Sequence, residues 1–469
     1  MERKKTAVAD IDRSAYDIAN PDDASFRVQK GLTSEIVEEI SAGKNEPEWM
    51  LALRLASLKT YESLAMPSWG PSLHELDMEQ VVTYVRPNTG GMKERWSDLP
   101  DEIKFTFDRL GLPEAEKTSL SGVGAQYDSE VVYHNVKEEM RQQGVVYTDM
   151  DTAVREYGDL VRAHFMKLLP ASAHKFMALH GAVWSGGSFV YVPEGVEVSM
   201  PLQSYFRLNA PGAGQFEHTL IIVEKGAKLH FIEGCSAPKY NVLNLHAGGV
   251  ELYVREGATL RYSTIENWSR NMLNLNSKRA LVDQNGAIEW VSGTFGSHIT
   301  MLYPTSILRG EGARSEYIGV SFAGAGQNLD TGTKVIHAAP NTSSTVMSKS
   351  ISKNGGIATY RSSISVLPEA EGTKSSVTCE SLMLDSESRS DTVPAMDIRN
   401  DKADIGHEAK IGRISEDTVF YLMTRGIGEA EAKALIVRGF VEPITKELPL
   451  EYAVEMNRLV ALEFEGSIG

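Results

Sequence analysis

The feature that most constrains this chain is a turn motif that recurs through its middle third. Each copy places a polar residue, a glycine and a small residue before a short run of strand-forming residues, and the glycines fall at positions 195, 226, 257, 286 and 312. The steps of 31, 31, 29 and 26 residues suit one supersecondary unit that stacks on the next. The period therefore predicts a β-solenoid, in the form of a parallel β-helix.

A β-sandwich is the rival architecture for this middle region. Segments with a period of two, such as 220–223, 228–232 and 250–254, fit strands of either fold. A sandwich, however, should show turn signals about every 8–12 residues, whereas one similar turn recurs here every 26–31 residues. The spacing favours the solenoid.

Helical patterns flank the predicted β-helix on both sides. Residues 1–175 are expected to be mainly helical, with one helix capped by Asn45 and another from about Asp149 to Leu169. Residues 176–410 form the predicted core, and residues 411–469 a small helical unit. The fold class predicted is mainly β with flanking α. The C-terminal helices are expected to start at Ser415, to stop before Gly426, and to resume over 429–437 and 451–462.

Charge and composition narrow the classes of partner. The 469 residues carry 47 Lys plus Arg against 63 Asp plus Glu, a net charge of −16, and no basic patch of useful length that would bind nucleic acid or an anionic membrane. No run approaches about 18 apolar residues and the opening lacks an apolar signal segment, so we expect a cytoplasmic protein. Two cysteines are too few for a disulfide framework.

The usual motifs of hydrolytic enzymes are missing from the sequence. It contains no phosphate-binding loop of the Gly-x-x-x-x-Gly-Lys-Ser/Thr type, no Gly-x-Ser-x-Gly elbow and no His-Glu-x-x-His pair. We therefore expect no catalytic activity of the chain's own, and any work from ATP must come from a partner.

A few residues nevertheless stand out as chemically active candidates. Cys235 lies in a Gly-, Ser- and Pro-containing segment that we interpret as a turn, with Lys239 near enough to favour the thiolate. His407 and Glu408 are adjacent, so that an imidazole and a carboxylate could bind iron or move protons. Cys379, on an expected strand, is interpreted as an inert buried thiol. We expect His218, His230 and His246 to be packed side chains rather than ligands.

Several segments together resemble the SufB scaffold subunits of the SufB/SufD family, which assembles iron–sulfur clusters in the SUF system. The resemblance implies a right-handed parallel β-helix with helical flanks, SufC-type ATPase subunits docked on the C-terminal helices, and SufD or a second SufB copy across the β-helix. It also implies sulfur supplied by a cysteine desulfurase system. The segments are Lys44-Asn-Glu-Pro-Glu-Trp-Met50, 200–209, Glu233-Gly-Cys-Ser-Ala-Pro238, Glu266-Asn-Trp268, 339–345 and Gly406-His-Glu408.

The same resemblance assigns roles to individual residues. Cys235 is implied as the sulfur-accepting thiol, and His407 and Glu408 as ligands of the nascent cluster and its iron. Glu266 stands where many relatives carry Gln, which places a carboxylate beside an anionic cargo. Ser388 occupies the position that we align with a second functional Cys. The implied internal sulfur path comprises Arg207, Asn209, Glu266, Trp268 and Lys278.

These implications lead to one main hypothesis and two alternatives. The chain is a scaffold for a transient Fe2S2 or Fe4S4 cluster, which it must share with a partner because it offers at most two of the usual four thiolates. A reduced flavin in the complex is left open as electron donor. The first alternative is a SufD-like structural subunit that holds no cluster. The second is a β-helix polysaccharide lyase or esterase, which rests on fold analogy alone.

Overall fold

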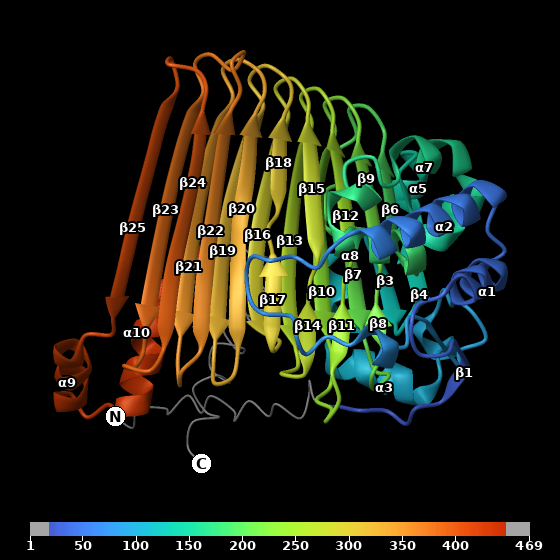
Figure 1. Cartoon of the computed structure of the whole chain (residues 1–469), viewed down its shortest axis with the longest axis horizontal. Helices are drawn as coiled ribbons and strands as arrows, with labels where there is room; N and C mark the ends of the chain where they lie inside the picture. Colours follow the sequence, from blue (N-terminus) through green and yellow to red (C-terminus); the bar gives the residue numbers. More distant parts are fainter. Residues whose placement is uncertain (1–17, 447–469) are drawn as a thin grey trace.

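The core of the molecule is a β-solenoid built from two long sheets. A computed structural model describes residues 18–446 and contains about eight solenoid turns. The strands of the two sheets run across the long axis and are stacked side by side along it (Figure 1), and all neighbouring coils pair in parallel. The prediction of a parallel β-helix rather than a sandwich is confirmed.

The first sheet has ten strands and uses one strand from each successive coil. Its strand order is β25-β23-β21-β19-β16-β13-β10-β7-β3-β4, so the last coil lies at one edge and the N-terminal hairpin at the other. The strands are β3 (Gly122–Tyr127), β4 (Glu130–Val136), β7 (Leu202–Arg207), β10 (Lys228–Ser236), β13 (Thr259–Trp268), β16 (Ala287–Gly296), β19 (Arg314–Ala323), β21 (Ser343–Ser352), β23 (Lys374–Met383) and β25 (Asp404–Arg413).

The second sheet has thirteen strands because several coils cross it as two short segments. From β20 onward each coil crosses it as one long strand. The strands are β5 (Val146–Asp149), β6 (Gly187–Val192), β8 (Gly214–Gln215), β9 (His218–Val223), β11 (Asn244–His246), β12 (Gly249–Val254), β14 (Met272–Asn274), β15 (Ser277–Val282), β17 (Ile299–Leu302), β18 (Thr305–Leu308), β20 (Asn328–His337), β22 (Ile357–Val366) and β24 (Arg389–Ile398).

The recurring turn sets the register between coils. In each copy one residue adopts positive φ, which glycine and, less readily, asparagine tolerate, and its N–H donates to a carbonyl in the corresponding turn of the next coil. At the fourth copy that residue is Asn285 rather than Gly286, so the glycine pattern misses the geometry there by one residue. The N–H donors are Gly195, Gly226, Gly257, Asn285, Gly312 and Asn341, at 2.7–3.1 Å from the carbonyls of Lys225, Glu256, Gln284, Glu311, Pro340 and Glu371.

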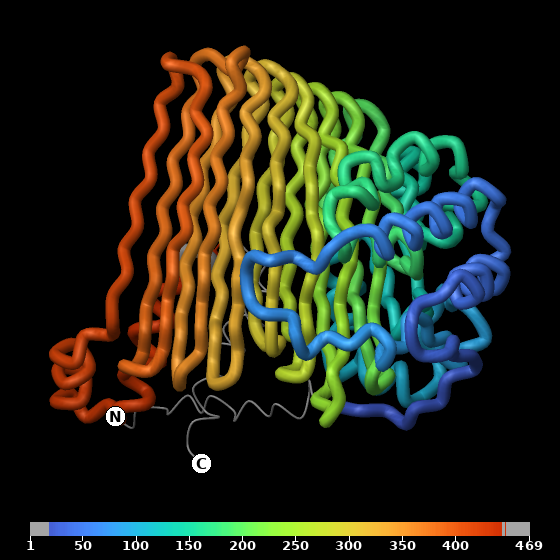
Figure 2. Tube along the Cα trace, in the orientation of Figure 1, coloured from blue at the N-terminus to red at the C-terminus, as the bar shows by residue number. Residues whose placement is uncertain are grey.

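Helices gather at the two ends of the solenoid (Figure 1). Strands β3, β4 and β5 from the N-terminal 175 residues also join the two sheets, and β1 (Ala24–Arg27) pairs with β2 (Val85–Pro87). The tube in Figure 2 shows the segment after α2 crossing the outer face near β17, where Trp69 packs on Tyr303. The N-terminal helices are α1 (Ser34–Lys44), α2 (Glu48–Ser63), α3 (Asp101–Arg109), α4 (Leu112–Ser119), α5 (Glu138–Gln142), α6 (Met150–Glu156), α7 (Gly158–His164) and α8 (Lys175–Val183).

Two of the predicted N-terminal helices have different bounds in the structure. Asn45 does not cap the start of a helix: it adopts positive φ at the C-terminal end of α1, and α2 begins at Glu48 after Pro47. The helix expected over 149–169 is two helices, α6 and α7, separated at Tyr157. Apolar spacing alone did not reveal either break, because a capping residue and a helix interruption leave the period nearly intact.

The C-terminal helices follow the predicted signals closely. The side chain of Ser415 caps α9 (Glu416–Thr424) by accepting the N–H of Thr418, and Gly426 follows with positive φ. Helix α10 (Glu429–Thr445) is longer than expected. The helix predicted over 451–462 lies outside the described residues.

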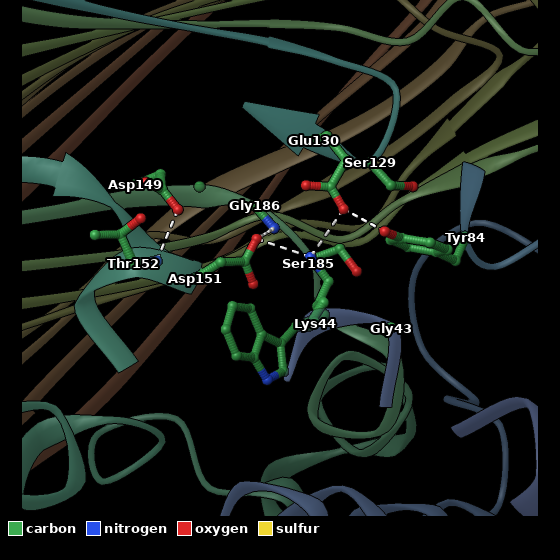
Figure 3. A network of polar contacts seen from close by, with 12 residues as sticks. Gly43, Lys44, Tyr84, Ser129, Glu130, Asp149, Asp151, Thr152, Ser185 and Gly186 are labelled. Carbon is green, nitrogen blue, oxygen red and sulfur yellow. Dashed lines mark hydrogen bonds and ion pairs between the residues drawn. The ribbon is translucent and has the colours of Figure 1, made fainter. Parts of the chain in front are cut away.

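A buried ion cluster ties α1 to the solenoid (Figure 3). The ammonium of Lys44 lies 2.8 Å from the Asp151 carboxylate on α6 and 3.2 Å from Glu130 on β4, and the Tyr84 hydroxyl donates to Glu130. Burial alone would lower the pKa of Lys44, but Asp151 and Glu130 reverse this effect and raise it. Lys44 therefore stays charged and links α1 to α6 and to β4 of the first sheet.

Replacing Lys44 by Ala should remove the cation from this cluster. We expect the free energy of unfolding to fall by about 3–5 kcal/mol, because two carboxylates would remain without their counterion. The exposed Lys30, whose ammonium donates to the Gln80 side chain, is the matched control and should change stability by less than about 1 kcal/mol. Urea unfolding of both variants measures this, and equal effects would contradict the assignment.

Candidate functional site

Cys235 lies inside a strand rather than in the turn that its sequence context suggested. Strand β10 continues to Ser236, because both of its neighbours supply parallel partners there: Cys235 pairs with Phe206 on β7 and with Glu266 on β13. The thiol-bearing residue is 1% exposed, and Lys239 lies beyond the strand on the surface. The expected thiolate-stabilising turn is therefore absent at this position.

The surroundings of Cys235 keep the thiol protonated. Burial is the main cause of a pKa raised well above the usual thiol value, and the carboxylates of Glu233, Glu266 and Glu217 raise it further. Lys278 acts in the opposite direction but does not offset them. Because the thiolate is the nucleophile, this environment favours the less nucleophilic form of Cys235.

Lys278 bridges the two sheets beside this thiol. From β15 its ammonium reaches across to the first sheet, 2.9 Å from Glu233, 3.7 Å from Glu266 and 3.0 Å from the Thr264 hydroxyl. The Tyr262 hydroxyl donates to the other oxygen of Glu233. Burial lowers the pKa of Lys278, but Glu233 and Glu266 more than compensate and raise it. The site thus holds an ammonium between two carboxylates.

Glu266 extends this cluster into a longer buried chain. Its second oxygen accepts the Asn274 amide N–H at 2.7 Å, the Asn274 oxygen lies 2.7 Å from His246, and His246 lies 2.5 Å from Glu217. Burial lowers the pKa of His246, but Glu217 reverses the shift and raises it. The Trp268 ring packs 4.6 Å from that imidazole. Glu266, the carboxylate that stands where many relatives carry Gln, is therefore paired with Lys278 and Asn274.

Sequence analysis identified only part of this cluster. It selected Cys235, Glu266, Lys278 and Trp268, which the structure brings together, but it gave no role to Glu217, Asn274 or Tyr262. A period of two places Glu233 on the same face as Cys235, so that residue could have been found. Tyr262 lies on the same face of β13 as Glu266, so it could have been found in the same way. Glu217 and Asn274 lie outside these strands, and only the packing of the coils reveals them. The buried, hydrogen-bonded state expected for His218 and His246 is confirmed.

Arg207 and Asn209 lie on the opposite side of the first sheet from Cys235. Arg207 pairs with Ser236, one residue after Cys235, and its guanidinium lies 3.0 Å from the Ser236 hydroxyl. The backbone N–H of Asn209 donates to Asp128 at 2.6 Å, and burial raises the pKa of Asp128 to about 6 against the effect of its N–H donors. These two predicted path residues thus flank the outer face of the strand end.

His407 and Glu408 lie far along the solenoid and point to opposite faces of β25. His407 is half-buried, with Nε2 at 3.5 Å from the thiol of Cys379, whereas Glu408 is exposed beside Lys410. Burial raises the pKa of Cys379 to about 12. Within one chain the structure therefore pairs His407 with Cys379 and does not bring it together with Glu408.

Ser388 has a structural environment of its own. It lies in the turn between β23 and β24, where its hydroxyl accepts the Gly355 N–H at 3.2 Å and its own N–H donates to Asp385 at 2.8 Å. Among residues 18–446 no three His, Cys, Asp or Glu side chains are grouped so that they could hold a metal ion. In the same range no helix has the length and apolar character needed to cross a membrane.

Comparison with known families and proteins decides the affiliation. Residues 206–440 match the family described as SUF system FeS cluster assembly, SufBD core domain, and residues 123–204 match the SufBD protein N-terminal region. The chain belongs to the SufBD family. This confirms the resemblance drawn from the motifs, and the matched core spans the coils that carry Cys235, Lys278, Cys379 and His407.

Relatives in the SufBD family match over the whole chain. The iron–sulfur cluster assembly protein SufB of Bacillus subtilis strain 168 is 51% identical over 98% of this chain and 99% of its own length. A SufBD family iron–sulfur cluster assembly protein of Staphylococcus aureus strain MRSA252 is 51% identical over 100% of both chains, and its counterpart in strain USA300 is 50% identical over 100% of both.

Lys278→Ala should lower the stability of this SufBD protein, because it removes the cation from the buried cluster. Two buried carboxylates would lose their counterion, so we expect a loss of about 3–5 kcal/mol in the free energy of unfolding at pH 7. Urea unfolding at pH 7 tests this, with Lys225→Ala, from an exposed pair with Glu256, as control. Equal losses in the two variants would contradict the assignment.

Proposed function

We propose that this SufBD protein is a scaffold on which sulfur and iron are joined into a transient iron–sulfur cluster. The observation that carries the proposal is that the chain's two thiols face the same interior of the β-helix. Cys235 stands at the N-terminal end beside the Lys278 cluster, and Cys379 stands near the open last coil beside His407. One thiol is placed to receive sulfur and the other to deliver it.

The first step is transfer of a sulfane sulfur to Cys235 from a persulfide of a cysteine desulfurase system. Cys235 attacks the terminal sulfur of the donor persulfide, so that a new S–S bond forms at Cys235 while the donor's S–S bond breaks. The thiol proton passes to the donor's leaving thiolate, which becomes a thiol, and no net electrons are exchanged. Lys278 supplies the positive charge that favours the attacking thiolate and the resulting persulfide anion.

A lane of small polar side chains connects the two thiols along the first sheet. In-register pairing puts the interior residues of successive coils in columns, and the column that contains Cys379 is adjacent to the one that contains Cys235. Five strand spacings of about 4.8 Å each separate the two thiols, or about 24 Å. The intervening residues are Thr264, Ser292, Gly319 and Ser348 in one column and Glu266, Thr294, Ser321 and Ser350 in the other.

The properties of this lane suit an anionic sulfur species. Hydroxyl groups can donate hydrogen bonds to a persulfide or polysulfide anion, and the Tyr317 hydroxyl, which occupies the space beside Gly319, adds a further donor. Arg207 and Asn209 lie outside the lane, at its outer entrance near Ser236. We therefore assign them to the entry of sulfur and Trp268 and Glu266 to the start of its passage.

The last coil is where we place the meeting of sulfur with iron. Cys379 and His407 offer a thiol and an imidazole from one chain, and the exposed Glu408 can offer a carboxylate toward a second chain. With two cysteines per chain, ligation must be shared, by SufD or by a second copy of this chain. Each sulfane sulfur needs two electrons to become sulfide, and oxidation of a reduced flavin balances that step.

The edges of the last coil support a partner at this end. In the described residues β24 pairs only with β22 and β25 only with β23, so both outer edges carry unpaired backbone groups that can add strands. Apolar side chains are exposed on these strands, among them Val393, Met396 and Ile411. A second β-helix can continue both sheets here, which would place two copies of the His407 region together.

The C-terminal helices provide a separate surface for a SufC-type ATPase. On α9 the side chains of Phe420, Tyr421 and Met423 are 66%, 56% and 42% exposed, and a group of exposed apolar side chains on one helix is typical of a surface that binds a partner. Because Cys235 is buried and protonated, a conformational change driven by that ATPase would open the site. The missing phosphate loop of the chain makes the partner necessary.

A SufD-like structural subunit remains the second candidate, and one observation favours it. Glu408 and His407 face opposite sides of β25, so one chain cannot present both to a single iron atom. A subunit that positions a partner and holds no cluster would need neither residue as a ligand.

Anaerobic purification after co-expression with a SufC-type ATPase separates the two candidates. We expect nearly equal iron and acid-labile sulfide in the wild type, readily removed by chelators, and a loss of about tenfold in both for Cys235→Ala and Glu408→Ala. Glu371→Ala is the matched control, because Glu371 is as exposed as Glu408 and likewise pairs with a surface lysine. A wild type that binds the ATPase but stays empty would favour the structural subunit.

The proposed lane leads to a separate prediction for a bulky substitution at Ser348. Ser348→Leu should fill the column next to Cys379 and reduce sulfide loading by about tenfold, while sulfane sulfur still accumulates on Cys235. Met347→Leu, on the same strand with its side chain on the other face, conserves volume and should leave loading unchanged. Mapping sulfane sulfur by mass spectrometry distinguishes these outcomes, and normal loading of the Ser348 variant would refute the lane.

A further inference from the structure

Two hydroxyl groups of the second sheet are unpaired at the end of the lane that holds Cys379. Tyr360 on β22 is 1% exposed, and it pairs in register with Thr392 on β24, so both side chains point to the same face. Among residues 18–446 neither hydroxyl oxygen, although buried, has a hydrogen-bond partner. Unpaired buried hydroxyls are costly and uncommon in folded proteins, so this pair calls for an explanation.

Strand position indicates that Tyr360 faces Cys379 across the interior. The turn 367–373 joins β22 to β23; Tyr360 is the seventh residue before this turn and Cys379 the sixth after it. Matching positions meet elsewhere in the solenoid, since Lys278, fifth from the end of β15, contacts Glu233, sixth on β10. A tyrosine spans most of the about 10 Å between packed sheets, and Tyr360 belongs to the same buried cluster as Cys379.

Both hydroxyls are suited to donate a hydrogen bond to an anion. Burial is the main cause that raises the pKa of Tyr360 well above its usual range, with smaller contributions from Tyr317 and Cys379, so the phenol keeps its proton. Thr392 carries an O–H donor that does not titrate. On the first sheet, Nε2 of His407 lies 3.5 Å from the thiol. A sulfur anion on Cys379 would therefore meet polar groups from both sheets.

We propose that Tyr360 and Thr392 bind the terminal sulfur of a persulfide on Cys379, to which their hydroxyls donate hydrogen bonds. The inference rests on the proposed function and adds the groups that hold the sulfur after its passage. Cys379 takes up sulfur by the same exchange as Cys235: an S–S bond forms at Cys379, the S–S bond of the arriving persulfide or polysulfide breaks, and the thiol proton passes to the departing sulfur. No net electrons are exchanged. The anionic sulfur accepts the hydrogen bonds that the resting site lacks.

The unpaired state of these hydroxyls distinguishes this role from a structural one. A hydroxyl that stabilises the fold has a partner in the resting protein, and its removal leaves that partner unsatisfied. Removal of a hydroxyl without a partner should leave stability unchanged or raise it. We therefore expect Tyr360→Phe to unfold at the same urea concentration as the wild type or at a higher one, while its ability to hold sulfur falls.

Mapping of sulfane sulfur in Tyr360→Phe and Thr392→Val tests the proposal, because each variant removes one hydroxyl and nearly conserves the side-chain shape. The full chain is purified anaerobically after co-expression with a SufC-type ATPase, and sulfane sulfur on Cys235 and on Cys379 is quantified by mass spectrometry. We expect the ratio of Cys379 to Cys235 occupancy to fall about tenfold in each variant, since each loses one hydrogen bond to a charged group.

Tyr303→Phe is the matched control, because the Tyr303 hydroxyl donates to Asp330 at 2.9 Å. It should lower the urea midpoint and leave the sulfur ratio unchanged. A loaded wild type with an unchanged ratio in both hydroxyl variants would overturn the inference alone. A urea midpoint lowered in Tyr360→Phe as in the control would also overturn it, since the hydroxyl would then be structural. A wild type without sulfane sulfur on Cys379 would instead overturn the proposed function, and the inference with it.

Discussion

The hydrogen bond from one left-handed turn residue to the next coil is the constraint on which the rest of this structure depends. It fixes where each coil begins relative to its neighbour, and thereby the pairing of every strand that follows. A slip of one residue would turn the interior side chains outward. With the register fixed, residues about 26–32 positions apart stand in columns, so that Cys235, Glu266 and Thr294 become neighbours although each belongs to a different coil.

The same stacking makes it possible to bury charge beside a thiol. Lys278, Glu233 and Glu266 meet across two sheets, and none of the three would be tolerated there alone, since an unpaired charge in the interior is costly. Replacing such a group by apolar residues often costs nothing in stability, so the cluster is better explained by chemistry than by folding. It supplies a cation that can stabilise a sulfur anion while the surrounding carboxylates keep the resting thiol protonated.

Sequence patterns predicted the architecture better than the site. The glycine period revealed the β-helix because a glycine in each turn meets a local backbone requirement for positive φ, and it missed the turns in which Asn285 and Asn341 meet that requirement instead. Cys235 was misplaced in a turn because Gly234 and Ser236 look like turn residues, whereas pairing with two neighbouring strands keeps the chain extended. Adjacency suggested that His407 and Glu408 act together, yet strand geometry sends neighbours to opposite faces. Contacts such as that of Asn274 with His246 depend on the strand register between coils, which cannot be read from a single sequence.

Because the coils stack at a regular spacing, the number of coils between two residues sets the distance between them along the solenoid. The separation of Cys235 from Cys379 is a whole number of strand spacings, and each coil contacts only its neighbours. Inserting or removing one complete coil between them would therefore lengthen or shorten the passage by a fixed increment of about 4.8 Å and leave both ends intact. In the proposed function, the number of coils between the thiols would fix how far sulfur travels, and that number could be changed without altering the residues around either thiol.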